Sequence, residues 1–315
     1  MARFARFDRF GPAPEVVRIV HEDPPHPGPG EVRVQVRAAG LNPVDFKIMG
    51  SAAVAANYGL VDVSGGAGIG FDFAGDIDEL GPGVTGFALG DTVLGGRRHH
   101  AVGDFVIVKA AGADVERDGV LIAKPDALDY DTAAALPVVG RTAIAALDRV
   151  GVGASDTVLV SAAAGGVGVI VAQLARLRGA TVVGTASARN HDFLRSLGVI
   201  PVAYGDGMLA RLRDAAPQGF TAALDNNGPE SVDAALELGV PLERINTIAA
   251  RGHRGAQGVG NPQATMEQFA EIVRLAASGE VIVPIEACYP LERVDEAYAL
   301  LAAGHVRGKV IAVTR

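Results

Sequence analysis

The segment whose residue types and spacing carry the clearest chemistry is a glycine-rich turn, Ser161-Ala-Ala-Ala-Gly-Gly-Val-Gly168. It follows the β-branched run 157–160 and precedes residues 169–177, where apolar side chains recur at helical spacing. Glycines between a strand and a helix let the backbone approach a pyrophosphate, and the N–H groups that begin the helix attract its charge. The pattern predicts a dinucleotide site, with Ala163 in the first glycine position of the usual fingerprint.

The loop after the second strand of such a fold selects the nicotinamide cofactor. A carboxylate there bonds the ribose 2′-hydroxyl of NAD and repels a 2′-phosphate. Here residues 184–190 contain no acid, but they offer the hydroxyl of Ser187 and the guanidinium of Arg189. Because arginine suits phosphate through its planar fork of donors, the loop favours NADPH. The alternative is that Arg189 is an ordinary surface arginine.

Around this turn, strands and helices alternate. After helical patterns at 131–136 and 141–149, strands are expected at 157–160, 181–184, 222–225 and 245–249, and helices at 169–178, 191–197, 231–237 and 266–277. This alternation predicts a parallel, doubly wound sheet.

The first third of the chain is β-rich instead. Residues 31–38 alternate strictly between valine and polar residues, and further strands are expected at 74–80, 91–94 and 105–108. Glycine- and proline-rich turns separate them, which is typical of a small barrel. A helix at 294–301 and a strand at 309–313 are expected near the end of the chain. The overall fold class is therefore α/β, with a β-barrel part and a doubly wound part.

The composition of the chain limits the classes of protein to which it can belong. The chain has 315 residues, 49% hydrophobic and 20% charged, which suits two globular domains. Its net charge of −8 disfavours a nucleic-acid partner. A single cysteine, Cys288, rules out an intrachain disulfide and is compatible with a reducing compartment. The N-terminus lacks the apolar segment of a signal peptide, and the chain has no apolar run long enough to span a membrane. These features predict a soluble, cytoplasmic protein.

Six short motifs carry a family resemblance when they are taken in order: residues 40–47, 70–75, 81–87, 90–93, 163–168 and 307–310. With them the chain resembles the zinc-free, quinone oxidoreductase-like branch of the medium-chain dehydrogenase/reductase superfamily. The resemblance implies a GroES-like β-barrel catalytic domain at 1–125 and 287–315, and a Rossmann NADPH-binding domain at 126–286. It also implies an active site in the cleft between the two domains, and a homodimer built by extending the nucleotide-domain sheet.

The same resemblance predicts that no metal takes part. Zinc alcohol dehydrogenases place a cysteine and a histidine at the positions of Asn42 and Phe71, and a second cysteine near Gly140; this chain has neither residue type there. His99 and His100 are adjacent, face opposite ways on a strand, and are expected to be surface or loop residues. Without a Lewis acid, hydride transfer to an activated C=C or a quinone is easier than reduction of a plain ketone. The expected enzyme is an NADPH-dependent quinone or enone reductase with a small-molecule electrophile as substrate.

Two residues are predicted to be catalytic. Asn42 matches an asparagine that lies near the nicotinamide in related quinone reductases, where it would orient the cofactor or a substrate oxygen. Its alternative reading is a turn start, because Asn-Pro often begins a turn. Tyr58, in Asn57-Tyr-Gly59, is similar to the proposed proton donor of enoyl thioester reductases, although residues 51–56 form an apparent insertion before it. Its alternative role is that of an aromatic anchor for the loop.

The resemblance also implies further cofactor contacts, and Asp72 is expected to be a structural carboxylate that accepts loop N–H bonds. The expected contacts are Thr142, Ala164, Gly165, Gly166, Val167, Gly168, Tyr204, Ile248, Ala249 and Lys309, besides Ser187 and Arg189. Two other functions stay open: a thioester-specific enoyl reductase that uses Tyr58, and a non-catalytic NADPH-binding or sensing protein. Basic pairs at 97–98 and 251–254 would suit a thioester carrier.

Overall fold

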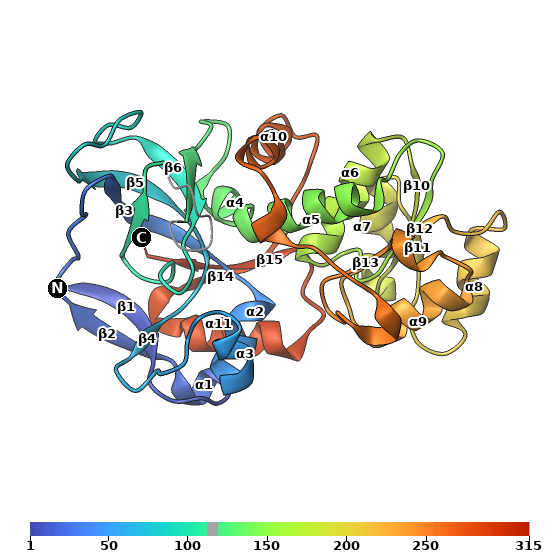
Figure 1. The fold of residues 1–315 in the computed structure, drawn as a ribbon, viewed down its shortest axis with the longest axis horizontal. Helices are drawn as coiled ribbons and strands as arrows, with labels where there is room; N and C mark the ends of the chain where they lie inside the picture. Colours follow the sequence, from blue (N-terminus) through green and yellow to red (C-terminus); the bar gives the residue numbers. More distant parts are fainter. Residues whose placement is uncertain (112–118, 315) are drawn as a thin grey trace. The chain divides into compact units, whose positions relative to one another are not determined.

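The computed structural model describes residues 1–111 and 119–314. It forms two compact units, Met1–Val138 with Ile285–Arg315, and Val139–Pro284 (Figure 1). The first boundary differs from the predicted position at 125/126 because helix α4 (Tyr130–Ala134) lies against the first unit's sheet. A Cβ at Gly40 would stand 2.1 Å from the Ala134 carbonyl oxygen, and the Tyr130 hydroxyl bonds Asp76. These contacts assign residues 126–138 to the first unit.

Within the described ranges, the main sheet of the first unit has seven strands. Its order is β14 (Ile285–Pro290), β15 (Lys309–Val313), β3 (Glu31–Leu41), β5 (Asp72–Leu80), β6 (Thr92–Gly96) and β8 (Val120–Ala123), with β7 (Phe105–Lys109) also paired to β3. As the alternation in the sequence predicts, Val32, Val34 and Val36 on β3 are buried. The strand at the end of the chain, β15, pairs antiparallel with β3 and thereby places Lys309 near the end of β3.

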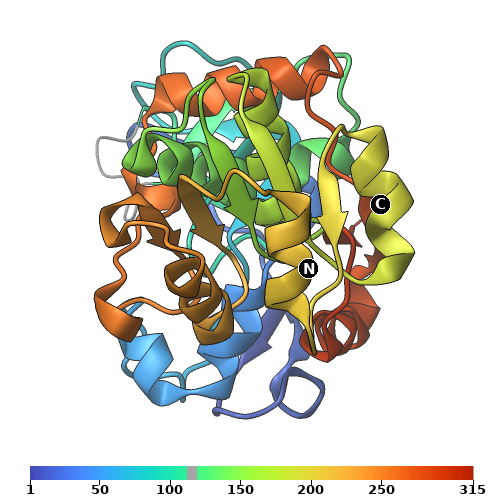
Figure 2. The same ribbon diagram turned by 90° about the vertical axis from the view of Figure 1, so that its right-hand side faces the viewer.

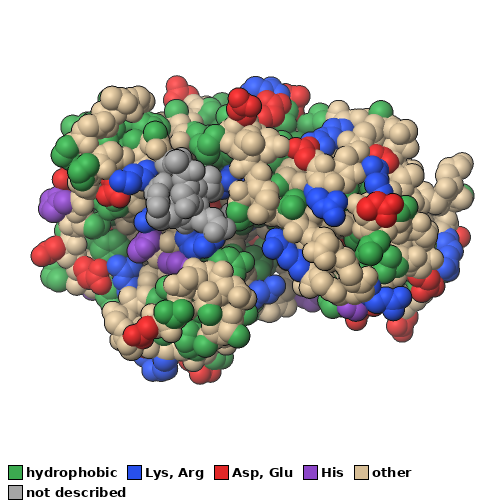
Figure 3. Space-filling model, in the orientation of Figure 1, with side chains coloured by type: hydrophobic (Ala, Val, Ile, Leu, Met, Phe, Trp, Pro, Cys, Tyr) green, Lys and Arg blue, Asp and Glu red, His purple; other side chains and the backbone are tan. Residues whose placement is uncertain are grey.

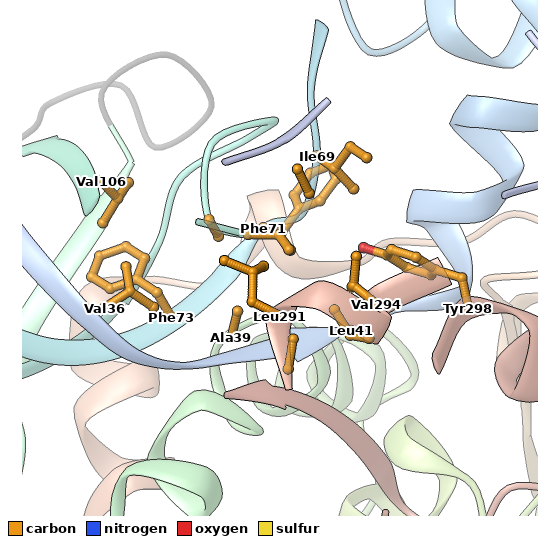
Figure 4. Packing of buried hydrophobic residues seen from close by; sticks show 14 of the residues in the cluster. Val36, Ala39, Leu41, Ile69, Phe71, Phe73, Val106, Leu291, Val294 and Tyr298 are labelled. Atoms are coloured by element: carbon orange, nitrogen blue, oxygen red, sulfur yellow. The ribbon is translucent and has the colours of Figure 1, made fainter. Parts of the chain in front are cut away.

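Several elements of this unit were not expected from the sequence. A small antiparallel sheet joins β1 (Ala2–Phe7) to β2 (Arg18–Glu22) and β4 (Ala67–Gly68). Helices α1 (Ala13–Val16), α2 (Pro43–Gly50) and α3 (Ala52–Ala56) accompany it, whereas α11 (Val294–Ala303) is the helix that was expected at 294–301. The core of the unit is continuous, and Figure 4 shows Phe73 beside Val36 and Val106, and Tyr298 beside Val294.

The second unit contains the predicted parallel sheet. Its order is β11 (Ile200–Val202), β10 (Thr181–Thr185), β9 (Thr157–Val160), β12 (Ala222–Asp225) and β13 (Ile245–Thr247). Its helices are α5 (Pro137–Val150, which begins in the first unit), α6 (Gly166–Leu177), α7 (His191–Ser196), α8 (Met208–Ala215), α9 (Pro229–Glu237) and α10 (Met266–Ala277). Figure 2 faces this unit and shows its strands side by side among these helices. The fold is therefore the α/β combination that the sequence predicts, and β11, α8 and the short 3-10 helices of this unit were not expected.

Short 3-10 helices complete the description: η1 (Ala188–Asn190), η2 (Leu242–Arg244), η3 (His253–Gly255), η4 (Asn261–Gln263) and η5 (Leu291–Arg293). Among the described residues, no helix combines the length and the apolar character needed to cross a bilayer. On the face drawn in Figure 3, acidic and basic side chains are interspersed, so that neither sign forms a continuous field there.

Candidate functional site

The glycine turn joins β9 to α6, and its geometry explains why glycine stands there. Gly165 is the residue before the helix, with extended backbone angles of φ −78° and ψ 175°. Ala162 has a positive φ of 46°, which folds its carbonyl oxygen under the first helical turn. A Cβ at Gly168 would stand 2.2 Å from that oxygen, so only glycine lets the helix begin this close to the turn. The first N–H groups of α6 therefore start directly at the turn.

The turn also lies against the neighbouring strand β10. The Ala163 N–H donates to the Thr185 carbonyl at 2.9 Å, and a Cβ at Gly184 would come within 2.5 Å of the Ala163 side chain. Directly after this strand, η1 carries Arg189, which is exposed, and Ser187, which is half-buried, precedes it. Tyr204, 49% exposed, follows the adjacent parallel strand β11. These three residues thus follow the carboxyl ends of neighbouring strands, where ligands bind in open α/β sheets.

On the other side of β9, one buried carboxylate connects the ends of three strands by hydrogen bonds. Asp225, 1% exposed at the end of β12, accepts bonds from the Ser161 hydroxyl at 2.9 Å and the Thr247 hydroxyl at 2.6 Å. It also accepts the backbone N–H groups of Asn227 and Gly228. This network was not predicted from the sequence. Its signal was a polar residue at or directly after the end of two predicted strands, Asp225 and Ser161, because the carboxyl ends of parallel strands meet at one edge of the sheet.

The remaining predicted cofactor residues of this unit lie at the same edge. Ile248 and Ala249 directly follow β13, and residues 258–260 run beside that strand end, since a Cβ at Gly258 would stand 1.8 Å from the Thr247 carbonyl oxygen. A Cβ at Gly260 would in turn lie 3.9 Å from the Thr142 side chain. The structure therefore gathers residues that are far apart in the sequence along the carboxyl edge of one sheet. Their contacts with a cofactor stay predictions.

The first unit holds a second feature, which we call the buried polar cluster. It comprises Asn42, Asp45, Asp72, Tyr298 and Lys309, each no more than 2% exposed. The residues come from the start of α2, the start of β5, helix α11 and the start of β15. The Asp45 carboxylate accepts the Asn42 backbone N–H at 2.8 Å and the Tyr298 hydroxyl at 3.1 Å. Five polar groups so deep in a core need these mutual bonds to offset their loss of water.

At the centre of this cluster is the amide of Asn42. Its Nδ2 donates to Asp72 Oδ2 at 2.9 Å and to the Gly40 carbonyl at 3.2 Å, while its Oδ1 accepts from Lys309 Nζ at 2.6 Å. Both N–H groups are therefore used, and the free capacity of the side chain is one lone pair on Oδ1. Asn42 can accept a bond from a ligand, but a substrate oxygen would need a donor. The predicted role of Asn42 is therefore limited to accepting a hydrogen bond. Its contact with the cofactor stays a prediction.

The buried polar cluster contains one ion pair, between Lys309 and Asp72. Burial raises the pKa of Asp72, which the charge of Lys309 opposes, and burial lowers the pKa of Lys309, which Asp72 and Asp45 oppose. Burial also raises the pKa of Asp45 to about 7. Asp72 accepts the Val138 backbone N–H at 3.0 Å, which is a structural bond, but its donor lies in the first turn of α5 and not in a loop as expected. The Lys309 ammonium is bonded to Asn42 and Asp72, and its predicted contact with the cofactor stays a prediction.

Tyr58 lies in the same unit, after α3, and is half-buried. Its ring meets Phe71 edge-on at 6.0 Å between centroids, and the Arg98 guanidinium lies 5.3 Å from the ring centre. Its carbonyl oxygen is 2.9 Å from His99 Nε2. Burial lowers the pKa of His99, so the neutral ring that carries its proton on Nε2 donates this bond. The backbone and ring of Tyr58 are thus anchored; donation of a proton by its hydroxyl stays a prediction.

Comparison with known proteins agrees with this geometry. Residues 28–121 match the alcohol dehydrogenase GroES-like domain, and residues 197–311 match the zinc-binding dehydrogenase family. The chloroplast envelope quinone oxidoreductase homolog of Arabidopsis thaliana is 28% identical, over 97% of this chain and 96% of that protein. The structure of the quinone oxidoreductase from Coxiella burnetii superposes with a TM-score of 0.83, at 28% identity over 100% of this chain and 99% of that one.

The chain belongs to the medium-chain dehydrogenase/reductase superfamily. It is thus an oxidoreductase with a GroES-like domain and a nucleotide-binding domain. It is also 34% identical, over 90% of its length, to the spectinabilin polyketide synthase system protein NorB of Streptomyces orinoci. It spans only 13% of that much longer protein.

A nicotinamide dinucleotide, which this superfamily implies, fits the second unit of the oxidoreductase. A Cβ at Gly168 would collide with the Ala162 carbonyl, so glycine lets α6 begin directly at the turn, where its first backbone N–H groups would be available to a pyrophosphate. The residues that would hold the cofactor are those of the turn, 164–168, together with the side chains that follow β10, β11 and β13.

Zinc, which the name of one matching family implies, does not fit the residues of the first unit. Phe71 is 8% exposed and apolar, and the Lys309 ammonium 2.6 Å from Asn42 Oδ1 would repel a divalent cation. His99 is tied to the Tyr58 carbonyl. Within residues 1–111 and 119–314, no three histidine, cysteine or acidic side chains lie together as metal ligands.

Proposed function

We propose that this oxidoreductase is an NADPH-dependent, zinc-independent reductase that transfers a hydride to an activated C=C or to a quinone. The observation that carries the proposal is the bond between Lys309 and Asn42. By the family resemblance Asn42 stands where zinc dehydrogenases have a metal ligand, and an ammonium beside it would disfavour a metal there and with it a substrate that needs Lewis-acid activation. Enones and quinones are already electrophilic and need only hydrogen-bond donors for the charge that develops on oxygen.

In this reaction the residues of the two units have different roles. When bound, a nicotinamide cofactor would supply the hydride that an enone accepts at its β-carbon, with the negative charge moving to the oxygen. In the second unit, the N–H groups at the start of α6 bind and orient the pyrophosphate. In the first unit, Tyr58 gives its hydroxyl proton to the α-carbon of the enolate and recovers it from water, so charge and protons balance. A positioned general acid typically contributes about 10²–10⁴-fold.

NADPH is the proposed cofactor because of the loop after β10. Arg189 is exposed there, Ser187 is half-buried, and no acidic residue occurs in residues 184–190. Tyr204 follows the neighbouring strand with half of its surface exposed. A guanidinium and a hydroxyl would bind a 2′-phosphate, whereas a guanidinium gains little from a neutral 2′-hydroxyl.

A second candidate is an enoyl thioester reductase that uses the same hydride and proton steps. Arg98 stacked on the Tyr58 ring favours it, because a carrier phosphate or a thioester oxygen near Tyr58 would meet a cation. The likeness to a polyketide synthase system protein also favours this candidate. A third candidate is a protein that binds NADPH without catalysis.

One experiment separates the three candidates: NADPH oxidation at 340 nm over a panel of enones, quinones and enoyl thioesters. Turnover of enones or quinones is the expected result, and turnover confined to thioesters supports the second candidate. Tight NADPH binding with no oxidation across the panel would overturn the reductase proposal and support the third candidate.

We also propose that the reductase acts as a cytoplasmic homodimer, as the family resemblance implies. Light scattering of the purified full chain checks the oligomeric state, since a mass near 32.2 kDa would contradict the dimer. Fractionation of the source cells checks the compartment.

A further inference from the structure

The amide of Asn42 is held by charged groups from distant parts of the chain. Lys309 is 267 residues away in sequence and donates to its Oδ1 at 2.6 Å. Asp72, 30 residues away, accepts from its Nδ2 at 2.9 Å. All three side chains are 2% exposed or less, so water does not compete for these bonds.

These neighbours allow the amide only one orientation. An ammonium only donates and a carboxylate only accepts, so the atom that faces Lys309 is the oxygen and the atom that faces Asp72 is the nitrogen. A flipped amide would place its NH2 group against the ammonium and its oxygen against the carboxylate. Both contacts would be repulsive in a buried site.

The cation is itself held in place. Lys309 Nζ lies 3.4 Å from Asp72 Oδ2, and the other carboxylate oxygen of Asp72 accepts the Val138 N–H at 3.0 Å. The nearby Asp45 binds the backbone of Asn42 and not its amide. Lys309 and Asp72 therefore form the two ends of a clamp, and the Asn42 amide lies between them.

We propose that Lys309 and Asp72 are positioning residues that make Asn42 an obligate hydrogen-bond acceptor in the reductase. The remaining lone pair of Asn42 Oδ1 then takes an N–H or O–H donor of the bound cofactor or substrate and rejects a carbonyl oxygen. This inference rests on the proposed function, because it assigns the specificity of one residue of that site. It gives a chemical role to Lys309, whose ammonium lies inside the first unit.

The test removes the clamp without leaving a buried charge. The double variant Lys309→Met/Asp72→Asn is neutral and close in size to the native pair, so it avoids the penalty of an unpaired carboxylate. Tyr298→Phe is the matched control, because it removes one bond to Asp45 in the same cluster and leaves the clamp intact. Thermal melts identify variants that have lost the fold.

Three measurements follow on the full chain. We expect the side-chain amide protons of Asn42, followed by NMR on 15N-labelled protein, to exchange faster in the double variant than in wild type or Tyr298→Phe. We expect NADPH to bind at least about tenfold more weakly if the donor belongs to the cofactor, or KM to rise by that factor if it belongs to the substrate. Adding Asn42→Ala to the double variant should cost little more, because the clamp acts through that amide.

The results separate this inference from the proposed function. The clamp is overturned if amide exchange is unchanged in the double variant. It is also overturned if the NADPH affinity and kcat/KM of the double variant are both within twofold of wild type. Additive losses with Asn42→Ala overturn it as well, since the charged pair would then act elsewhere. If the wild-type protein oxidises NADPH with none of the electrophiles in the panel, the reductase proposal is refuted. Amide exchange and NADPH affinity still decide the clamp in that case.

Discussion

Replacing Gly168 by alanine tests whether the glycine turn holds the pyrophosphate. The new Cβ would stand 2.2 Å from the Ala162 carbonyl oxygen and 2.9 Å from the Ala163 Cα. Ordinary contacts between such atoms begin well beyond 3 Å, so the glycine turn and the first helical turn of α6 must move apart by about 1 Å. Overpacking of this kind typically costs about 1–3 kcal/mol of stability. The fold should survive, but the N–H groups would no longer converge on one position.

The expected effect on binding follows from that displacement. A misplacement of about 1 Å commonly costs about 10²-fold in affinity or rate. At an NADPH concentration of 100 times the wild-type Kd, binding stabilises the native state by about 2.7 kcal/mol. A hundredfold weaker Kd leaves about 0.4 kcal/mol at the same concentration. The rise in Tm on adding NADPH should therefore almost disappear in Gly168→Ala.

The chain offers a matched control in the same unit. Gly153 precedes β9, and a Cβ there would have no other atom within 4 Å. Gly153→Ala should leave the NADPH affinity unchanged. The assays are NADPH fluorescence titration and thermal melts with and without cofactor. A folded Gly168→Ala protein that binds NADPH within threefold of wild type would refute the assignment of the pyrophosphate to this turn.

Four further predictions concern the proposed chemistry. Wild type should prefer NADPH over NADH at least about tenfold, and Arg189→Ala should erase the preference; comparable Kd values in wild type contradict this. Tyr58→Phe should lower kcat on an enone about 10²-fold, and unchanged turnover would leave Tyr58 a loop anchor. Since burial raises the pKa of Asp45 to about 7, stability relative to Asp45→Asn should fall as pH rises from about 4 to about 7; a flat urea-unfolding difference contradicts it. Metal analysis should find no stoichiometric zinc, and activity should survive a chelator.

Local pattern was a good guide in the second unit. The strands at 157–160 and 222–225 and the helix at 266–277 were predicted with the bounds that the structure has. Each is a regular apolar segment between clear turn residues, so its hydrophobic period decides its structure. The strand expected at 245–249 ends at Thr247, because the Thr247 hydroxyl takes the N–H groups of Ala249 and Ala250.

The first unit was harder because its smaller elements depend on partners far along the chain. Strand β1 pairs with two-residue β4, about sixty positions away, and the short helix α1 lies beside α11 near the end of the chain. Short segments like these have little intrinsic preference and form only when distant partners cover them. The sequence around them shows no period long enough to detect.

The glycine turn, the acid-free loop with Arg189, and the absence of zinc-ligand residue types at 42 and 71 can be read from the chain alone, because each is a matter of residue identity at a known spacing. The surroundings of Asn42 depend on the folded arrangement. A strand that begins at Lys309 returns to pair with β3 and places an ammonium against the amide, while Asp72 closes its other side. No local pattern encodes that contact, because the three residues meet only after segments 30 and 267 positions away have folded together.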